Sequence, residues 1–475
     1  MAGKGGELTT QLLRPVKLKV ERISDLTQEN LNKIFQHYFQ DKTLSVEILK
    51  GHQNFLGQND QFQSDIKKWE VNIIRQGEKK NLSFIVKTTT DSSFQQFNTR
   101  ISRQFFTETF WYKFAFPTLK KDFPELAPLS PTWYFAYSNY EDSFRADYCD
   151  KSCGYFCRAF HHKNEVGIIL MENACEEDRH TGFPTMVSID KTKVMSLNQV
   201  KAAMKALAVF HGAWWVWLRK KKREEFTDYV DNPMNIEDIE EAFMKLRKIP
   251  IWSTKSFFGE FARQFPKLLK NFGGDEKLVA RLKFFIKNKL FVESKRMFEP
   301  EIETSVMKTM THGDYWVNNM LFSSSDPEDA ELTVTMLDFQ LMTLAHPARD
   351  IWYLLYCNTD KEFRDKHLQE ILQEYFNIFS SYLQLEKITI SFQDFLKDIS
   401  YLRAFMALTF SVMVQFLALS PEPLSFSTMR DIKVVQDTFK QQVASPPKEC
   451  DDPMIKEMRR RMLGIIYELD NEGLL

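Results

Sequence analysis

Residues 311–340 read THGDYWVNNMLFSSSDPEDAELTVTMLDFQ, and this stretch decides how the chain is interpreted. Asp314 and Asn319 stand five residues apart, and His312 precedes the aspartate by two. The same offset separates the two residues of the H-R-D-x-x-x-x-N loop, in which Asp takes the proton of an acceptor hydroxyl and Asn binds magnesium. The spacing therefore indicates phosphoryl transfer, with Asp314 as the catalytic residue, His312 bracing its loop and Asn319 as a metal ligand.

The residues beyond Asn319 predict a hairpin that ends in a second metal ligand. Residues 320–322 are apolar, residues 323–331 form a polar turn, and residues 333–337 alternate into Asp338. One carboxylate and one amide leave room for phosphate oxygens and water in the octahedral shell of Mg²⁺. We therefore expect Asp338 and Asn319 to hold magnesium between the phosphates of ATP.

The run HGDYWVNNMLF, followed by a hairpin and LDFQ, resembles the HGD-x-W-x-x-N-N signature of the ecdysteroid kinase-like family. These small-molecule kinases are related to the choline and aminoglycoside kinases. The resemblance implies an α+β, bilobal protein-kinase-like fold, with a small, mostly antiparallel β N-lobe and a larger, mainly helical C-lobe. It also implies ATP and Mg²⁺ as cofactors and a hydroxyl of a small organic molecule, steroid-like acceptors included, as the phosphate acceptor.

An upstream hairpin is expected to carry the lysine that kinase chemistry needs. Residues 69–73 alternate, Gly77 marks a turn, and residues 82–89 (LSFIVKTT) form a second strand with Lys87 near its end. FIVK resembles the V-A-I-K pattern, in which the lysine contacts the α- and β-phosphates. The alternative is a solvent-exposed strand lysine.

Residues 103–116 (RQFFTETFWYKFAF) have helical spacing and are expected to end at Pro117. Glu108 stands among aromatic residues, where a buried carboxylate needs a cationic partner, and Lys87 is the expected one. The resembled family also has a glutamate four residues before a tyrosine, as Glu108 stands to Tyr112. The alternative is a glutamate that faces solvent.

The expected phosphate loop departs from the pattern of the resembled family. That pattern is similar to G-x-N-x-x-S, and this chain offers Gly57, Asn59 and Ser64, with the serine about two positions late. A close approach of the backbone to phosphates favours glycine, and the segment contains little of it. A polar surface turn is the alternative interpretation.

The sequence also predicts the surroundings of Glu172, His211 and Asp350. Residues 166–173 (VGIILMEN) form a buried strand with Glu172 near its end, where the family has the hinge that binds adenine through backbone groups. Residues 206–215 (ALAVFHGAWW) resemble the family's Leu-Ala-x-x-His-Ala helix, with Gly212 for the alanine and His211 as a packed structural histidine. Asp350 in HPARDIWYLLY is interpreted first as a helix cap, with a role in supporting the catalytic loop as the alternative implied by the family.

Length and pattern predict two lobes. The chain has 475 residues, more than one core usually supports. We expect a loose tail over residues 1–20, a nucleotide-binding N-lobe over 21–172 with an insertion at about 138–165, and a helical C-lobe over 173–475 that holds the catalytic loop and the substrate pocket.

Charge and apolar patterning exclude several partner classes. The net charge is −1, with 63 basic and 64 acidic residues, so nucleic acid is not an expected partner, and the basic run at 219–223 is interpreted as a solvated helix face. Residues 404–420, 17 apolar-rich residues, are expected to form a buried helix of the C-lobe, so no membrane span is expected. No secretory, prenylation or myristoylation pattern is present in the sequence given, which makes the cytoplasm the default location. The oligomeric state stays open.

Cys149, Cys153 and Cys157 recur every four residues, and His161 continues the series. On one helix face these side chains could bind a metal such as zinc, although structural zinc sites usually have shorter cysteine spacing. Reduced, partly buried thiols are the favoured interpretation.

The leading hypothesis is thus a small-molecule kinase. A protein kinase is disfavoured because the chain reads DFQ where protein kinases have D-F-G, and no A-P-E-like segment precedes Asp350. The alternative from another class is a pseudokinase that acts as a nucleotide-binding or interaction scaffold, which the glycine-poor loop motivates.

Overall fold

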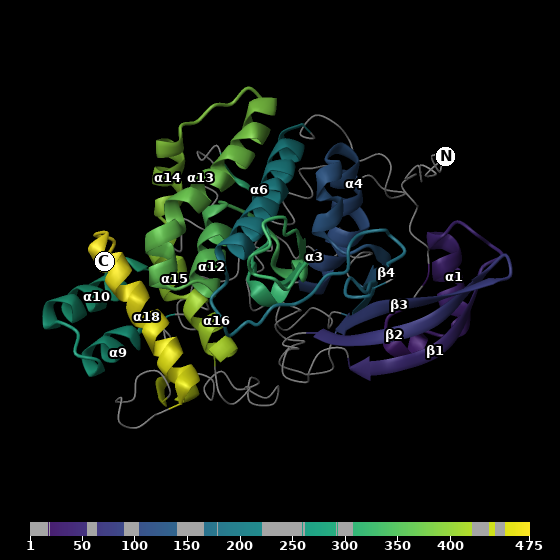
Figure 1. The fold of residues 1–475 in the computed structure, drawn as a ribbon, viewed down its shortest axis with the longest axis horizontal. Coiled ribbons are helices and arrows are strands. Elements are labelled where there is room, and N and C mark those ends of the chain that lie inside the picture. Colours follow the sequence, from purple (N-terminus) through teal and green to yellow (C-terminus); the bar gives the residue numbers. More distant parts are fainter. Residues whose placement is uncertain are drawn as a thin grey trace, which may run out of the picture.

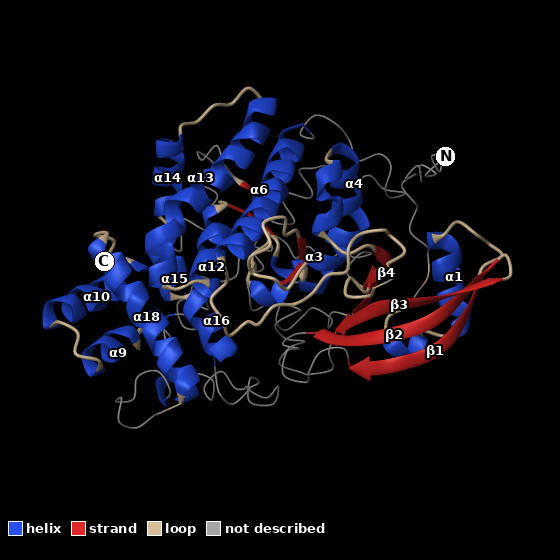
Figure 2. Ribbon diagram, in the orientation of Figure 1, coloured by secondary structure: helices blue, strands red, loops and turns tan. Residues whose placement is uncertain are grey.

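The computed structural model describes residues 18, 20–54, 64–89, 104–139, 166–177, 179–220, 259, 262–290, 292, 307–419, 437–441 and 452–475. It has the predicted α+β architecture, with an antiparallel sheet in the amino-terminal part and helices in the carboxy-terminal part. Figures 1 and 2 show strands β1 to β3 toward one end of the molecule and most of the helices toward the other. The arrangement is consistent with a bilobal, protein-kinase-like fold.

The amino-terminal sheet is antiparallel, with the strand order β1-β2-β3-β5-β4. Its strands are β1 (Ser45–Asn54), β2 (Ser64–Arg75), β3 (Glu78–Thr89), β4 (Trp133–Ser138) and β5 (Gly167–Glu172). β2 and β3 form the predicted hairpin, and Gln76 and Gly77 in its turn have φ angles of 52° and 84°. Two left-handed central residues are typical of the type I′ turn, whose twist matches that of a hairpin.

The two faces of β3 have different surroundings. Phe84 packs on one face against Phe35 of α1 (Gln28–Tyr38), with ring centroids 5.5 Å apart. Ile85 belongs to the core on the other face, which continues into the helices. Because side chains alternate along a strand, Lys87 shares the face of Ile85. The strand pattern therefore directs this lysine toward the helical part of the molecule.

The helix that carries Glu108 continues past Pro117, so the expected end at this proline is wrong. Three consecutive segments make up the helix: α3 (Gln104–Phe110), a π-helical turn (Trp111–Ala115) and α4 (Phe116–Asp122). The N–H of Phe116 donates to the carbonyl of Trp111, five residues back. The widened turn relieves the contact between a proline ring and the preceding turn that normally ends a regular helix.

The carboxy-terminal part is built from helices around one core. They are α6 (Leu197–Lys220), α9 (Phe265–Asn271), α10 (Glu276–Asn288), α12 (Ala348–Asn358), α13 (Lys361–Leu385), α14 (Phe392–Ser400), α15 (Arg403–Leu408), α16 (Phe410–Leu419) and α18 (Pro453–Asn471). α6 and α13 lie side by side (Figure 1). A Cβ atom on Gly212 of α6 would lie 2.3 Å from the ring of Tyr382 on α13. This close approach explains the glycine at the position where the family pattern has alanine.

Residues 404–419, the described part of the run expected to form one buried helix, form two helices. α15 ends at Leu408 and α16 begins at Phe410. Between them Thr409 has φ of −125° and ψ of −83°, and its hydroxyl donates to the carbonyl of Phe405. The described side chains of this run are almost all buried, as the sequence predicted. Among the described residues, no helix combines the length and the apolar character that crossing a bilayer requires.

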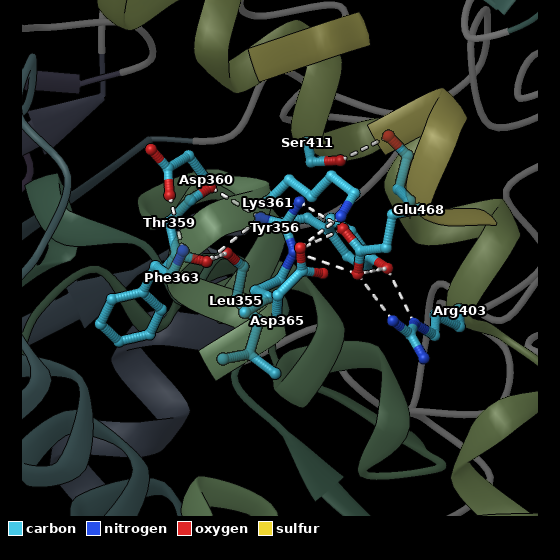
Figure 3. A network of polar contacts seen from close by, with 12 residues as sticks. Leu355, Tyr356, Thr359, Asp360, Lys361, Phe363, Asp365, Arg403, Ser411 and Glu468 are labelled. Carbon is cyan, nitrogen blue, oxygen red and sulfur yellow. Dashed lines mark hydrogen bonds and ion pairs between the residues drawn. The ribbon is translucent and has the colours of Figure 1, made fainter. Parts of the chain in front are cut away.

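α18 is joined to three other helices by a buried polar network (Figure 3). Glu468 of α18 accepts hydrogen bonds from Arg364 of α13 at 2.7 Å and from Arg403 of α15 at 2.6 Å. Tyr356 of α12 donates its hydroxyl to the same carboxylate at 3.0 Å. All four side chains are buried. Because buried charges are costly without partners, this network ties the last helix to the core.

Two short strand pairs frame the segment that carries Asp314 and Asn319. β6 (Thr309–Thr311) pairs with β9 (Thr343–Ala345), and β7 (Met320–Phe322) pairs with β8 (Val334–Met336). The second pair is the hairpin predicted beyond Asn319. Residues 312–319 lie between β6 and β7, and Asp338 follows β8, so the two pairs bring these segments to one region of the fold.

Candidate active site

Lys87 lies between two carboxylates that come from distant parts of the chain. Its Nζ atom donates to Oε2 of Glu108 and to Oδ1 of Asp338, each at 2.6 Å. Lys87 is 4 % exposed and Glu108 is 1 % exposed, whereas the side chain of Asp338 is 24 % exposed. The alternatives in which the lysine and the glutamate face solvent are therefore wrong.

When Glu108 is ionised, this cluster of Lys87, Glu108 and Asp338 holds one positive and two negative charges. Burial alone would lower the pKa of Lys87, but the charges of Asp338 and Glu108 outweigh burial and raise it. Burial raises the pKa of Glu108 to about 7, with Lys87 opposing the rise and Asp338 adding to it. One ammonium group thus binds two carboxylates. The excess negative charge favours a further cation at the exposed side of the cluster, where Asp338 lies.

Asp338 has an uncommon backbone conformation. Its φ of 62° and ψ of 65° lie in the left-handed region, which costs a residue other than glycine about 1–2 kcal/mol. The side chain is held at both oxygens, because Lys87 donates to Oδ1 and Gln340 donates to Oδ2 at 3.0 Å. Such strain persists where surrounding contacts fix it, and it is concentrated at functional sites.

Asp314 is also held at both carboxylate oxygens. The hydroxyl of Tyr353 donates to Oδ1 at 2.6 Å, and Nδ2 of Asn319 donates to Oδ2 at 2.9 Å. The same Nδ2 atom donates to the backbone carbonyl of Asp314 at 2.8 Å. Burial, and then the charge of Asp338, raise the pKa of Asp314 to about 6. A raised pKa makes a carboxylate a stronger proton acceptor while it stays ionised at neutral pH.

Asp350 supports the loop that carries Asp314. It accepts the backbone N–H groups of His312 at 2.6 Å and Gly313 at 2.9 Å, and Nε2 of His211 at 3.1 Å. The first interpretation of Asp350 as a helix cap is wrong, since α12 begins after Pro347 and has no side-chain cap. Burial would raise the pKa of Asp350, but the hydrogen bond from His211 and nearby positive charge hold it below its usual range.

The two histidines of this region are buried and structural. His211 donates from Nε2 to Asp350 and accepts the hydroxyl of Tyr375 at Nδ1, 2.8 Å away. His312 donates from Nε2 to the carbonyl of Leu337 at 3.0 Å, which connects the loop that carries Asp314 to the end of the β7–β8 hairpin. Burial lowers the pKa of both histidines, so both rings are neutral near pH 7.

Gly313 cannot carry a side chain in this loop. Its φ is 87°, and a Cβ atom would lie 2.2 Å from the carbonyl oxygen of Leu341. The glycine between His312 and Asp314 therefore allows the loop to pass close to the segment that follows Asp338.

Among the other predicted site residues, Glu172 makes its side-chain contacts elsewhere. Glu172 ends β5, and its buried carboxylate binds both Nε of Arg179 at 3.1 Å and Nη2 at 2.8 Å, as well as the hydroxyl of Thr181 at 2.6 Å. The side chain fastens the segment after β5, so a hinge role would fall to the backbone. Ser64 is the first residue of β2. Gly57, Asn59, Cys149, Cys153, Cys157 and His161 lie outside the described residues.

The predicted donor set suits magnesium on chemical grounds. Asn319 commits its amide nitrogen to Asp314, which leaves Oδ1 as the amide atom that a metal could use. Asp338 supplies a carboxylate, and the cluster around it has excess negative charge. Within the described ranges no three His, Cys, Asp or Glu side chains gather into a metal cluster. A small oxygen donor set of this kind fits Mg²⁺, which keeps several water or phosphate ligands.

The sequence did not predict that Tyr353, Gln340 and Arg349 contact the residues of this site. Arg349 donates to the carbonyl of Gly313 at 3.3 Å, and the other two contact Asp314 and Asp338. The available signal was spacing: Tyr353 follows Asp350 by three residues, which places both on one face of a helix.

A sequence model of the ecdysteroid kinase-like family matches residues 58–388 of the chain. The match covers more than half of the chain and includes Lys87, Glu108, Asp314, Asn319 and Asp338. A search of curated proteins found no match.

Proposed function

The chain belongs to the ecdysteroid kinase-like family, and we propose on that basis that it is an ATP- and Mg²⁺-dependent kinase acting on a small-molecule hydroxyl. The observation that carries the proposal is the ammonium group of Lys87, bound to Glu108 and Asp338 at once. Kinase chemistry needs a lysine that is oriented by a helix glutamate beside a metal-binding aspartate.

In the proposed reaction, the hydroxyl oxygen of the acceptor bonds to the γ-phosphorus of ATP. The bond from that phosphorus to the bridging oxygen breaks, and ADP leaves with the electron pair. Asp314 takes the hydroxyl proton and later releases it to solvent. One ATP and one alcohol thus give ADP, a phosphate monoester and one proton. The pKa of about 6 suits Asp314 to this task, because the carboxylate is ionised at neutral pH and more basic than an ordinary one.

The other residues bind and orient. Lys87 would contact the α- and β-phosphates as a point charge, and Glu108 keeps its ammonium group in place. Asn319 and Asp338 would hold Mg²⁺, which when bound neutralises charge on the transferring phosphoryl group. His312 and Asp350 brace the loop. We propose the division between the nucleotide-binding N-lobe and the helical C-lobe at residues 172 and 173, where β5 ends.

The acceptor is the finer part of the proposal. Steroid-like alcohols are the first candidate acceptors, because the description of the matching family refers to ecdysteroid kinases. The test is formation of a phosphorylated product from Mg-ATP with sterols, ecdysteroids, choline-like amines and aminoglycosides as separate acceptor classes. Product from one class supports the kinase and identifies its substrate class. Absence of product with every class, in protein that binds Mg-ATP, contradicts transfer to these acceptors.

A scaffold is the second candidate, and the glycine-poor sequence over residues 51–65 favours it. Asp314→Asn separates the two candidates, because it keeps the shape of the side chain and removes the base. A catalyst should lose nearly all turnover and keep its affinity for nucleotide. A scaffold has no turnover in the wild type, and the substitution leaves its binding unchanged.

A further inference from the structure

We propose that Tyr353 is a positioning residue that fixes the carboxylate of Asp314 for proton transfer, an inference that rests on the proposed function. The hydroxyl of Tyr353 lies 2.6 Å from Oδ1 of Asp314. Tyr353 is 2 % exposed and belongs to α12, a helix that is buried along its whole length.

α12 contacts the catalytic loop at successive points. Asp350 accepts the N–H groups of residues 312 and 313, and Tyr353 donates to the side chain of Asp314. Further along the helix, Oδ1 of Asn358 accepts the N–H of Val317 at 2.9 Å. The order along the helix matches the order along the loop. α12 therefore acts as a template for the loop, and Tyr353 is its contact with the proposed base.

Two donors define the plane of the Asp314 carboxylate. Asn319 donates to Oδ2, but it belongs to the same segment between β6 and β7 as Asp314. Tyr353 donates to Oδ1 from a helix of the core, so it fixes the carboxylate relative to the rest of the molecule. Each carboxylate oxygen accepts about two hydrogen bonds, so a position remains for the acceptor hydroxyl.

The tyrosine hydroxyl stays a donor. Burial, and then the charge of Asp314, raise the pKa of Tyr353 well above its ordinary value. Phenylalanine at this position would keep the packed ring and remove the hydroxyl that donates to Asp314. The Asp314 carboxylate would then lose its hydrogen bond from α12, and misplacement of a reacting group by about 1 Å can cost about 100-fold in rate.

The test compares Tyr353→Phe with Tyr356→Phe in the full chain. Tyr356 is a matched control, because it is a buried tyrosine on the same helix whose hydroxyl contacts Glu468 and Arg403, away from the loop (Figure 3). We expect Tyr353→Phe to lower kcat by about 10- to 100-fold, with KM for ATP and for the acceptor within about twofold of the wild type. Tyr356→Phe should lower the denaturation midpoint and leave kcat unchanged.

A readout without turnover checks the same bond. Urea unfolding of the wild type, Tyr353→Phe, Asp314→Ala and the double variant forms a cycle, and we expect the two losses not to add. Additive losses would overturn the inference, as would full kcat in Tyr353→Phe or equal kcat losses in both tyrosine variants. A wild type that transfers no phosphate overturns the proposed function itself. Turnover by the wild type with an unaffected Tyr353→Phe overturns only the positioning role.

Discussion

The ammonium group of Lys87 lies 2.6 Å from the carboxylate of Asp338, although 251 positions separate the two residues in the sequence. Alternation along β3 directs the lysine toward the helices, and the β7–β8 hairpin, followed by a left-handed residue, directs the aspartate toward the lysine. The contact joins the sheet to the segment that follows β8.

Lys87→Met should strongly destabilise the fold. The change leaves Glu108 buried without its cation, and breaking a buried ion pair on one side costs about 3–5 kcal/mol. We expect a loss of this order in the free energy of unfolding, measured by urea denaturation. Lys80→Met, an exposed position on the same strand, should stay within about 0.5 kcal/mol of the wild type. Equal effects of the two substitutions would show that the buried cluster contributes little to stability.

Asp350→Asn distinguishes a loop support from a helix cap. The amide places an N–H₂ group where the carboxylate now accepts three donors, His312 N–H, Gly313 N–H and His211 Nε2. We expect a loss of about 3–5 kcal/mol in the free energy of unfolding, together with most of the turnover. A cap would cost about 1 kcal/mol and leave turnover intact. Denaturation and a turnover assay on the same sample decide between these outcomes.

Gly212→Ala should be destabilising even though the family pattern has alanine there. The added Cβ atom would meet the ring of Tyr382 at 2.3 Å, and overpacking of this kind costs about 1–3 kcal/mol. Tyr382→Leu removes the ring, so the loss from Gly212→Ala should be smaller in that background. Thermal unfolding of the two single variants and the double variant measures the difference. Losses that add would place the cause elsewhere.

The buried histidines should each lower stability as the pH drops below about 6.5, whereas Glu108 and Asp314, with pKa values raised to about 7 and about 6, contribute in the opposite direction. Burial lowers the pKa of His180, His211 and His312 from the ordinary value of 6.5, so the folded chain resists protons that the unfolded chain binds. Their contribution to stability is fully present above that pH and is lost as the pH falls toward the folded-state values. Thermal unfolding of the wild type and of histidine variants across this range separates the histidine contribution from that of the two carboxylates.

His180→Gln tests one histidine away from the proposed active site. The His180 ring lies within hydrogen-bond distance of the hydroxyls of Tyr38 and Tyr134, and glutamine cannot gain a proton in this range. The variant should therefore lose part of the slope of stability against pH below about 6.5. An unchanged slope would show that His180 is not among the groups responsible.

Local sequence signals predicted much of the fold. Alternating residues with Gly77 between them predicted the β2–β3 hairpin, and the apolar and polar runs after Asn319 predicted the β7–β8 hairpin. These features depend on neighbours in the chain, so they can be recognised without tertiary contacts. The pairing of Lys87 with Glu108 followed from the cost of a buried carboxylate among aromatic residues.

The features that the sequence did not predict depend on tertiary contacts. The sequence predicts a helix end at Pro117, but one extra residue in a π turn lets the helix continue. The extra residue leaves no recognisable signal in the local pattern of apolar and polar residues. Asp350 at a helix start has the same sequence whether it caps that helix or accepts the loop of another segment. Tyr353 could not be assigned because the face of α12 that meets Asp314 depends on how the helix packs.

The most direct test of the account is Mg²⁺-dependent phosphoryl transfer from ATP by the wild type and by Asp338→Ala, with Asp326→Ala in the exposed β7–β8 turn as the control. We predict transfer by the wild type and by Asp326→Ala, and nearly complete loss of transfer in Asp338→Ala. Equal transfer by Asp338→Ala, or transfer that continues without a divalent cation, would contradict the proposed site.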